Sequence, residues 1–268
     1  MVRVNDQDVT EYYHRAVVCH SIGLDLSLPI DVEMIRPGEG EVAAAQRLLE
    51  RMFAAYARFF DVVVADAIYL EGPFFTYCLN HGKDVVAVLK GNNPALLEDA
   101  RGLFDPMTPL VKRYDKRILR VWDAGGFTSS ENISVPLRVL HTEETESRRQ
   151  RLADQWGTTT HTSSWYWATT LSKTRCPMAV LHKAGHDRWD IENKDFNTLG
   201  RDWALNHCFK HDPVAIVNFI LTLFIAFVLL QSFFRRNLKP QCRRIFSTLI
   251  RIGDELHGEL TAAGRHPP

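Results

Sequence analysis

Short apolar runs and segments of helical periodicity alternate over the first hundred residues. Runs rich in β-branched and aromatic residues, such as "YYHRAVVCHSI", predict strands, and "EVAAAQRLLERMFAAYARFF" has the apolar spacing of a long helix. The predicted strands lie at 12–22, 26–35, 61–69 and 84–91, and the predicted helices lie at 41–60, 72–82 and 93–104. This order predicts a mixed α/β layer in which helices pack on a sheet.

The pattern changes to shorter β-rich pieces over residues 106–182. The pieces are "KRILRVWDAG", "VPLRVLHTEET", "TSSWYWATTL" and "PMAVLHKAG", with polar turns and the charged run "ESRRQRLADQW" between them. They predict a β-rich insertion or second lobe. From Asp187 the pattern is helical to about residue 234, and a last helix is predicted at about 240–263.

One segment near the C-terminus is apolar enough to complicate this picture. "VAIVNFILTLFIAFVLL" (214–230) is nearly all apolar, and Arg235 and Arg236 follow it. Its length is at the short end of the range for a transmembrane helix. By pattern alone it is either a membrane span or a helix buried on all sides within a large domain.

The composition is that of a globular protein with no global basic field. Of the 268 residues, 46% are hydrophobic and 24% are charged, and 32 Lys+Arg balance 32 Asp+Glu. This balance disfavours a tight nonspecific nucleic-acid binder but allows a local basic groove. The five cysteines are scattered without a C-x-x-C pair, which predicts no disulfide framework and favours a reducing cytosol. The polar N-terminal residues do not have the pattern of a signal peptide.

Asp66 is the first candidate for chemistry. It follows four apolar residues in "VVVADAIY", at or near the C-terminal end of a predicted buried strand. Ligand-binding residues of open α/β sheets gather at such strand ends. A carboxylate there is costly unless it is paired, hydrogen-bonded or bound to a metal. The alternative is that Asp66 caps the helix that begins near Gly72.

The stretch "GHDRWDIENKDFNTLGRDW" carries a second candidate pair, Arg188 and Glu192. In a helix these two residues lie one turn apart beside an apolar face of aromatic residues at seven-residue spacing. One interpretation is an ordinary ion pair that contributes about 0.2–0.5 kcal/mol. The other is a site in which Glu192 binds a divalent metal and Arg188 orients it or grips a phosphate.

Two further motifs contain histidine or tryptophan. His207 and His211 flank Cys208 at a spacing that could bind zinc on a helix. No second ligand pair is evident and the motif H-E-x-x-H is absent, so we interpret them as polar residues at a helix end.

In "WYW", strand alternation puts Trp165 and Trp167 on the same face. They are either core residues or a platform that stacks on nucleic-acid bases.

The order of these pieces resembles the catalytic domain of DDE-type insertion-sequence transposases. That family has a ribonuclease H-like fold with a β-rich insertion before its last acidic residue. "VVVADAIY" resembles the strand with the second catalytic Asp, and "DVVAVLKGN" resembles the strand after it. "RWDIENKDFNTL" fits the family signature Tyr-x2-Arg-x3-Glu-x6-Lys at Arg188 and Glu192. The resemblance covers roughly residues 10–240.

The resemblance implies a ribonuclease H-like mixed sheet with flanking helices, closed by C-terminal helices. It divides the chain into a core at 1–105, the β-rich insertion at 106–182, the catalytic helix with a buried apolar helix at 183–240, and a C-terminal helix and tail at 241–268. Residues 214–230 would be the apolar helix that packs against the sheet in this family, rather than a membrane span.

The resemblance also implies cleavage and joining of DNA strands at the ends of an insertion sequence. Asp66 and Glu192 would each hold one of two Mg²⁺ (or Mn²⁺) ions about 4 Å apart, because these ions prefer carboxylate oxygens. Arg188 would clamp a phosphate, and Trp165, Trp167 or Trp122 would stack on a flipped base. The implied partners are the double-stranded DNA ends of the element and a second copy or a full-length transposase, in the bacterial cytosol.

Departures from the family pattern bear on activity. Gly185 and Leu199 stand where the signature has Tyr and Lys, and the first strand of the family fold, with its metal-bridging Asp, is not found. We therefore expect a chain that is truncated at its N-terminus and inactive. The alternatives are a non-catalytic DNA-binding or transposase-inhibiting protein of the same fold and a membrane-associated protein.

Overall fold

The computed structural model describes residues 2–4, 7–9, 13–24, 26–130, 132–152, 155–241 and 249–263. The chain forms two compact units. Unit 1 comprises Met1–Leu49 and Trp189–Pro268, and unit 2 comprises Glu50–Arg188.

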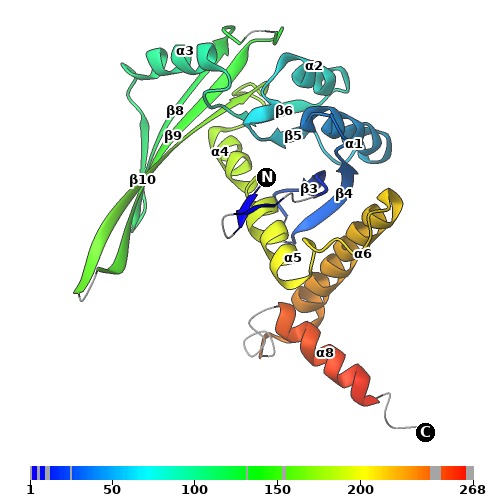
Figure 1. Ribbon diagram of the computed structural model, residues 1–268. Coiled ribbons are helices and arrows are strands. Elements are labelled where there is room, and N and C mark those ends of the chain that lie inside the picture. The colour runs from blue at the N-terminus through cyan, green and yellow to red at the C-terminus, as the bar shows by residue number, and fades with distance from the viewer. Residues whose placement is uncertain are drawn as a thin grey trace. The chain divides into compact units, whose positions relative to one another are not determined.

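Unit 2 is built on a six-stranded mixed sheet of order β5-β6-β10-β9-β8-β7 (Figure 1). β5 and β6 are parallel, and the other neighbours are antiparallel. Because β10 pairs with β6, the strands predicted as a β-rich insertion continue the sheet of the α/β half. The strands are β5 (Val62–Ala65), β6 (Asp84–Val88), β7 (Leu110–Arg113), β8 (Arg117–Phe127), β9 (Leu137–Leu152) and β10 (Gln155–Thr169).

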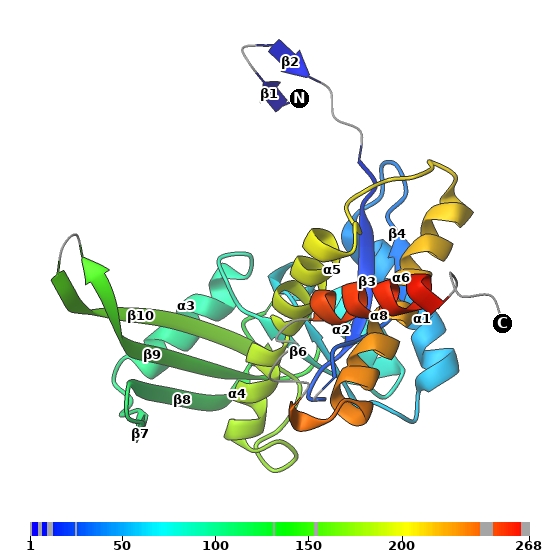
Figure 2. The same ribbon diagram turned by 90° about the horizontal axis from the view of Figure 1, so that it is seen from below.

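Helices cover both faces of the sheet of unit 2 (Figure 2). On one face, Phe104 of α3 packs on His141, whose ring stacks on Tyr166 with centroids 3.9 Å apart. On the other face, Leu181 of α4 joins the buried core around Trp167. Successive strand residues point to opposite faces, so Tyr166 and Trp167 divide between the two layers. The helices of this unit are α2 (Gly72–Asn80), α3 (Pro94–Phe104), α4 (Met178–Asp187) and a 3-10 turn at Ala67–Tyr69, and α1 (Glu41–Tyr56) runs from unit 1 into it.

The segment "PMAVLHKAG" is the helix α4, so its prediction as a β piece is wrong. Pro177 lacks an amide hydrogen and has φ −57°, which suits the residue before a helix. Leu181 and Gly185, four residues apart, are the buried positions, which is helical rather than strand spacing. The charged run between the predicted β pieces also differs from expectation, because its residues 146–152 and 155–156 belong to the long paired strands β9 and β10.

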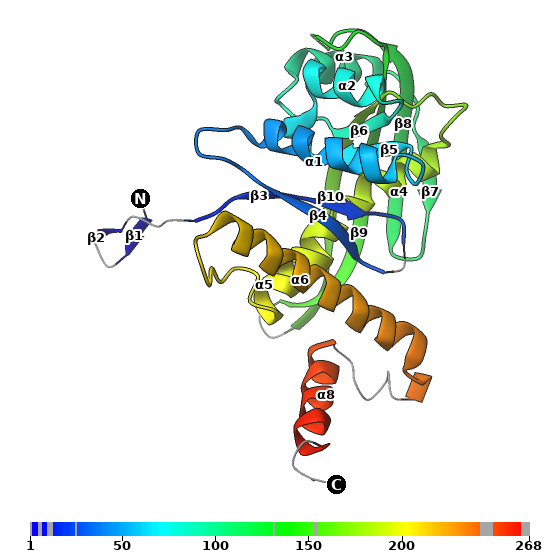
Figure 3. The ribbon, with the colours of Figure 1, turned by 90° about the vertical axis from the view of Figure 1, so that its right-hand side faces the viewer.

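Unit 1 combines two two-stranded sheets, β1-β2 and the hairpin β3-β4, with the helices that follow Trp189 (Figure 3). α6 packs on β4, and Val32, Leu199, Phe224 and Phe227 form their shared core. The elements are β1 (Val2–Val4), β2 (Gln7–Val9), β3 (Ala16–Ser21), β4 (Leu28–Met34), a π-helical turn at Ile191–Phe196, α5 (Asn197–Asp202), α6 (Pro213–Ser232), a second π-helical turn at Phe233–Asn237, and α8 (Leu249–Ala263). Of the predicted last helix, residues 242–248 lie outside the described residues.

α6 with its continuation to Asn237 has the length and apolarity of a membrane-spanning helix, and 11% of its most apolar window is buried. Phe224 and Phe227, each 2% exposed, face the hairpin, whereas Ile225 and Leu229 are more than half exposed. One face of α6 therefore packs on β4, but the helix is not buried on all sides, unlike the core helix predicted for 214–230. Length and apolarity alone are weak evidence for a membrane span, because core helices pass the same test.

Candidate active site

Asp66 stands at the carboxyl end of β5, as predicted from the apolar run before it. Lys90 follows β6 at the same edge of the sheet, because β5 and β6 run parallel. The Lys90 Nζ lies 3.9 Å from Oδ1 of Asp66. The sequence reasoning overlooked Lys90, although its position two residues after an apolar strand is the signal that would have found it.

One oxygen of the Asp66 carboxylate caps a turn, and the other lies near Arg188 without a hydrogen bond to it. Its Oδ1 accepts the amide hydrogen of Ala67 at 2.7 Å, so Asp66 caps the 3-10 turn Ala67–Tyr69 rather than the longer α2. Its Oδ2 lies 4.0 Å from Nη1 of Arg188, beyond hydrogen-bond distance. The side chain is 42% exposed, which leaves this oxygen accessible to a cation or a ligand.

Arg188 is held beside Asp66 by the end of α4. Its amide donates to the carbonyl of Ala184, and its side chain is 11% exposed. The sequence spacing predicts Glu192 as the partner of Arg188. Within unit 2, Asp66 is an acidic neighbour of Arg188. A buried guanidinium next to a half-exposed carboxylate makes a dipolar site that suits a phosphate or a metal-bound phosphate.

Two departures from the family signature have packing reasons. A Cβ at Gly185 would lie 2.5 Å from Cε2 and Nε1 of Trp167, so a tyrosine cannot enter at 185 while this indole occupies the layer. Leu199 is completely buried with Phe224 and Phe227 in the core of unit 1. A lysine at 199 would bring an ammonium group into that core.

Trp165 and Trp167 of β10 lie together on the α4 face, with ring centroids 6.4 Å apart. Trp167 is 1% exposed and belongs to the core, whereas Trp165 is half-buried. Trp122 lies on the opposite face, where it stacks on His141 at 4.7 Å. There, Trp122, Tyr166 and Arg101 line an open hollow of about 550 Å³.

A carboxylate and two histidines, which sequence reasoning missed, lie between β9 and α4. Oε1 of Glu144 accepts hydrogen bonds from Nε2 of His182 at 2.9 Å and from Nε2 of His186 at 2.7 Å. These two bonds hold the pKa of the Glu144 carboxyl well below its usual range, against the effect of burial. The spacing of His182 and His186 was the available signal, because residues four apart share a helix face.

Glu192 belongs to unit 1, where it lies half-buried in the π-helical turn Ile191–Phe196. The helix predicted from Asp187 to about residue 234 is therefore interrupted, both by this π-helical turn and by residues 203–212 between α5 and α6. Its carbonyl accepts the amide hydrogen of Asn197, which is the wider hydrogen-bond step of a π turn. Single π-helical turns inside helices are frequent at functional sites.

The curated proteins include no match to this chain. A family model described as the transposase DDE domain matches residues 6–229, which is most of the sequence. The mixed sheet with flanking helices agrees with the ribonuclease H-like fold of such transposases. With this match and this fold, the chain belongs to the family of transposases with a DDE domain.

Proposed function

We propose that Asp66 and Glu192 are metal ligands for DNA strand cleavage and transfer at the ends of an insertion sequence. The observation that carries the proposal is the position of Asp66. It follows a parallel strand, with Lys90 at 3.9 Å and Arg188 at 4.0 Å, in a chain of the DDE transposase family. Basic side chains around one accessible carboxylate suit a phosphodiester brought to a metal.

The residues fit Mg²⁺ or Mn²⁺ because both proposed ligands are carboxylates, and these ions prefer hard oxygen donors. The ions, when bound, would activate the attacking oxygen and stabilise the leaving one. Arg188 would bind the phosphate with its fork of N–H donors, and Lys90 would add a positive charge at the strand ends. Asp66 would exchange its contacts with these cations for the metal.

Trp165 is the tryptophan that we propose for stacking on a DNA base. It is half-buried beside His186, with ring centroids 6.0 Å apart, so part of its indole can accept a planar partner. Trp167 would have to leave its packing against Gly185 to do the same. Stacking on an indole tolerates any base and typically contributes about 1–3 kcal/mol.

A third acid is needed for the metal pair of this family, and the resemblance assigns only two to this sequence. Among the described strands, β5 has a neighbour on its β6 side alone. Its other edge could pair with a strand that carries the third acid, from a longer polypeptide or from a second chain. We therefore expect residues 1–268 by themselves to bind DNA without cleaving it, in the bacterial cytosol where the element's DNA lies.

Metal titration tests the ligand assignment. Mn²⁺ binding, followed by calorimetry, should weaken at least about tenfold in Asp66→Asn and in Glu192→Gln, because each change removes a direct ligand. Asp61→Asn is the matched control, since Asp61 lies at the opposite end of the same strand. If Asp66→Asn and Glu192→Gln bind Mn²⁺ like the unaltered protein, the assignment is wrong.

A DNA assay separates the catalytic from the non-catalytic alternative. The purified chain is incubated with element-end DNA and Mg²⁺, and binding and cleavage are measured on the same samples. We expect binding that Trp165→Ala weakens, and no cleavage. Cleavage by residues 1–268 alone would refute the need for a third acid from elsewhere, and absence of DNA binding would refute the DNA-end partner.

A further inference from the structure

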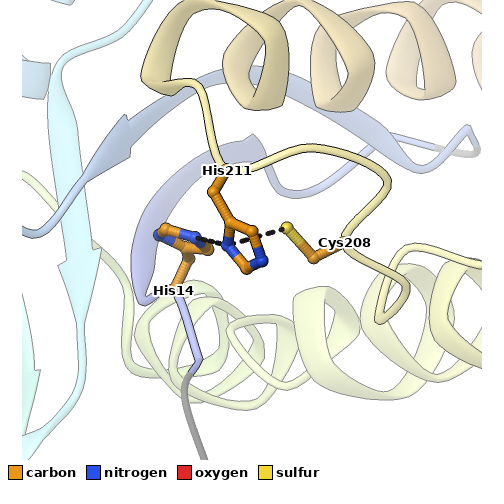
Figure 4. Close-up of side chains that lie close together, drawn as sticks. All are labelled: His14, Cys208 and His211. Carbon is orange, nitrogen blue, oxygen red and sulfur yellow. Dashed lines mark hydrogen bonds between the residues drawn. The ribbon is translucent and has the colours of Figure 1, made fainter.

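Three side chains of unit 1 bring nitrogen and sulfur ligand atoms together outside the proposed active site (Figure 4). His14 lies just ahead of β3, and Cys208 and His211 lie in the segment between α5 and α6. Nε2 of His14 is 3.0 Å from Nδ1 of His211, and Sγ of Cys208 is 3.8 Å from the same Nδ1. All three ligand atoms lie within 4.8 Å of one another.

We propose that His14, Cys208 and His211 bind Zn²⁺. Tetrahedral zinc with bonds of about 2.0–2.1 Å to nitrogen and about 2.3 Å to sulfur separates two nitrogens by about 3.3 Å, and a nitrogen from a sulfur by about 3.6 Å. The separations of 3.0 and 3.8 Å differ from these values by a few tenths of an ångström. The third separation, between a ring nitrogen of His14 and Sγ of Cys208, is within 4.8 Å, so rotation of these exposed side chains would bring the three atoms around one ion.

The ligand types favour zinc over the magnesium of the proposed active site. Imidazole and thiolate are the borderline and soft donors that zinc selects, whereas magnesium takes oxygen. Cys208 is exposed, so a metal ion can reach its sulfur from solvent. By contrast, burial raises the pKa of Cys78 to about 12, which makes that thiol a poor ligand.

In the absence of a metal, hydrogen atoms occupy positions on the proposed ligand atoms that the ion would take. The Cys208 thiol donates to the carbonyl of Lys210, and one ring nitrogen of the histidine pair must carry the hydrogen between His14 and His211. On zinc binding, the Cys208 thiol would release its proton to water, and the ring hydrogen between the two histidines would move to the other nitrogen of the same imidazole. In the Glu144 cluster of unit 2, the carboxylate already accepts hydrogen bonds from both imidazoles, so these groups are paired without a metal ion.

The proposed site is open on one side. His14 and His211 line a hollow of about 620 Å³ at the surface of unit 1. A fourth coordination position there would be taken by water or by a small ligand, as in zinc sites with three protein ligands. Because His14 and His211 are 197 positions apart, the metal would close a very long loop and stabilise unit 1.

Zinc titration of the full chain tests the site, with a non-thiol reductant present. We expect one tight Zn²⁺ per chain, and on Co²⁺ substitution a thiolate-to-cobalt charge-transfer band. His14→Ala, Cys208→Ser and His211→Ala should each weaken zinc binding about 100-fold or more. Mutating a residue that only hydrogen-bonds to a metal ligand already lowers metal affinity about 10–100-fold. His207→Ala is the matched control and should bind zinc normally, since this neighbouring exposed histidine packs edge-on against Phe209.

Two further variants separate this site from the others. Asp66→Asn and His182→Ala should both keep the tight zinc and the charge-transfer band, so the result does not depend on the proposed active site. Thermal unfolding gives a second readout, in which zinc should raise the Tm of the unaltered chain but not of Cys208→Ser. Cys208→Ser with unchanged zinc affinity, or loss of zinc from His182→Ala alone, would overturn the proposal.

Discussion

Unit 1 and unit 2 carry the same kinds of group but hold them by different means. In unit 2, Asp66 and Lys90 extend from paired strands, and Arg188 ends a helix packed on the same sheet. In unit 1, Glu192 lies on a π-helical turn and His211 on the segment before α6. Sheet pairing sets side chains in place before any ligand binds, whereas turns and loops gain order from the ligand itself.

The largest effect should come from the buried ion pair that ties the strands of unit 2 together. Arg138 is 4% exposed, makes two hydrogen bonds of 2.8 Å to Asp123, and donates to the carbonyls of Ser172 and Cys176 ahead of α4. Arg138→Ala should lower the free energy of unfolding by about 3 kcal/mol, because Asp123, 15% exposed, loses its two short hydrogen bonds and keeps only the longer ion pair with Lys173 at 3.8 Å. Urea unfolding measures this loss.

An exposed pair on the same sheet is the control for Arg138. Arg120 lies 4.0 Å from Glu143, with both side chains about 40% exposed. Arg120→Ala should cost less than about 1 kcal/mol. Equal losses in the two variants would show that unit 2 does not depend on its buried ion pair.

Most of the first hundred residues could be predicted from the sequence because their structure is local. The helix α1 follows its apolar spacing, and β5 and β6 follow their continuous apolar runs. α4 could not be told from a strand by its apolar start, since four apolar residues fit either structure. The ends of β9 and β10 were missed because a charged run has no apolar alternation.

The next effect concerns unit 1, where a buried amide joins α6 to the hairpin. Nε2 of Gln231 donates to the carbonyl of Ser27 at 2.9 Å, and Oε1 of Gln231 accepts the Ser27 amide hydrogen at 3.1 Å. Gln231→Ala should cost about 2–3 kcal/mol, because both backbone groups lose their partner while buried. Asn218→Ala, exposed on the same helix, should be nearly neutral in the same unfolding measurement.

Glycine substitutions should have opposite signs in the two units. Gly185→Ala in α4 should cost about 1–3 kcal/mol, because the new Cβ meets the Trp167 ring. Gly258→Ala in α8 should stabilise by about 0.5–1 kcal/mol, because no atom lies within 4 Å and alanine favours a helix. Thermal unfolding of both variants distinguishes packing from helix propensity, and a stable Gly185→Ala would mean that Trp167 moves readily.

The candidate sites could be predicted only where one residue and its neighbours define them. Asp66 was predicted from the apolar strand before it, and Arg188 with Glu192 from a spacing, and their shared role in a site stays a prediction. The partners of His186 and His211 lie 42 and 197 residues away, at Glu144 and His14. No local pattern contains such pairings, because they arise from strand register and from packing of distant segments.

The smallest effect is a pH dependence that should belong to unit 2. The pKa of Glu144 is lowered in the folded protein by its hydrogen bonds to His182 and His186. A lowered folded pKa contributes stability that is fully present above the unfolded pKa, about 4.3, and is lost as pH falls below it. Between about pH 4 and pH 3 the free energy of unfolding of the unaltered chain should therefore fall by roughly 1 kcal/mol more than that of Glu144→Gln, since each proton taken up on unfolding corresponds to about 1.4 kcal/mol per pH unit.

Glu143→Gln, one residue away on the opposite face, is the control and should have the same pH profile as the unaltered chain. If Glu143→Gln and Glu144→Gln have the same pH profile, the two imidazoles do not hold the carboxylate in its charged form, and the Glu144 cluster would be as open to a cation as the one at His14.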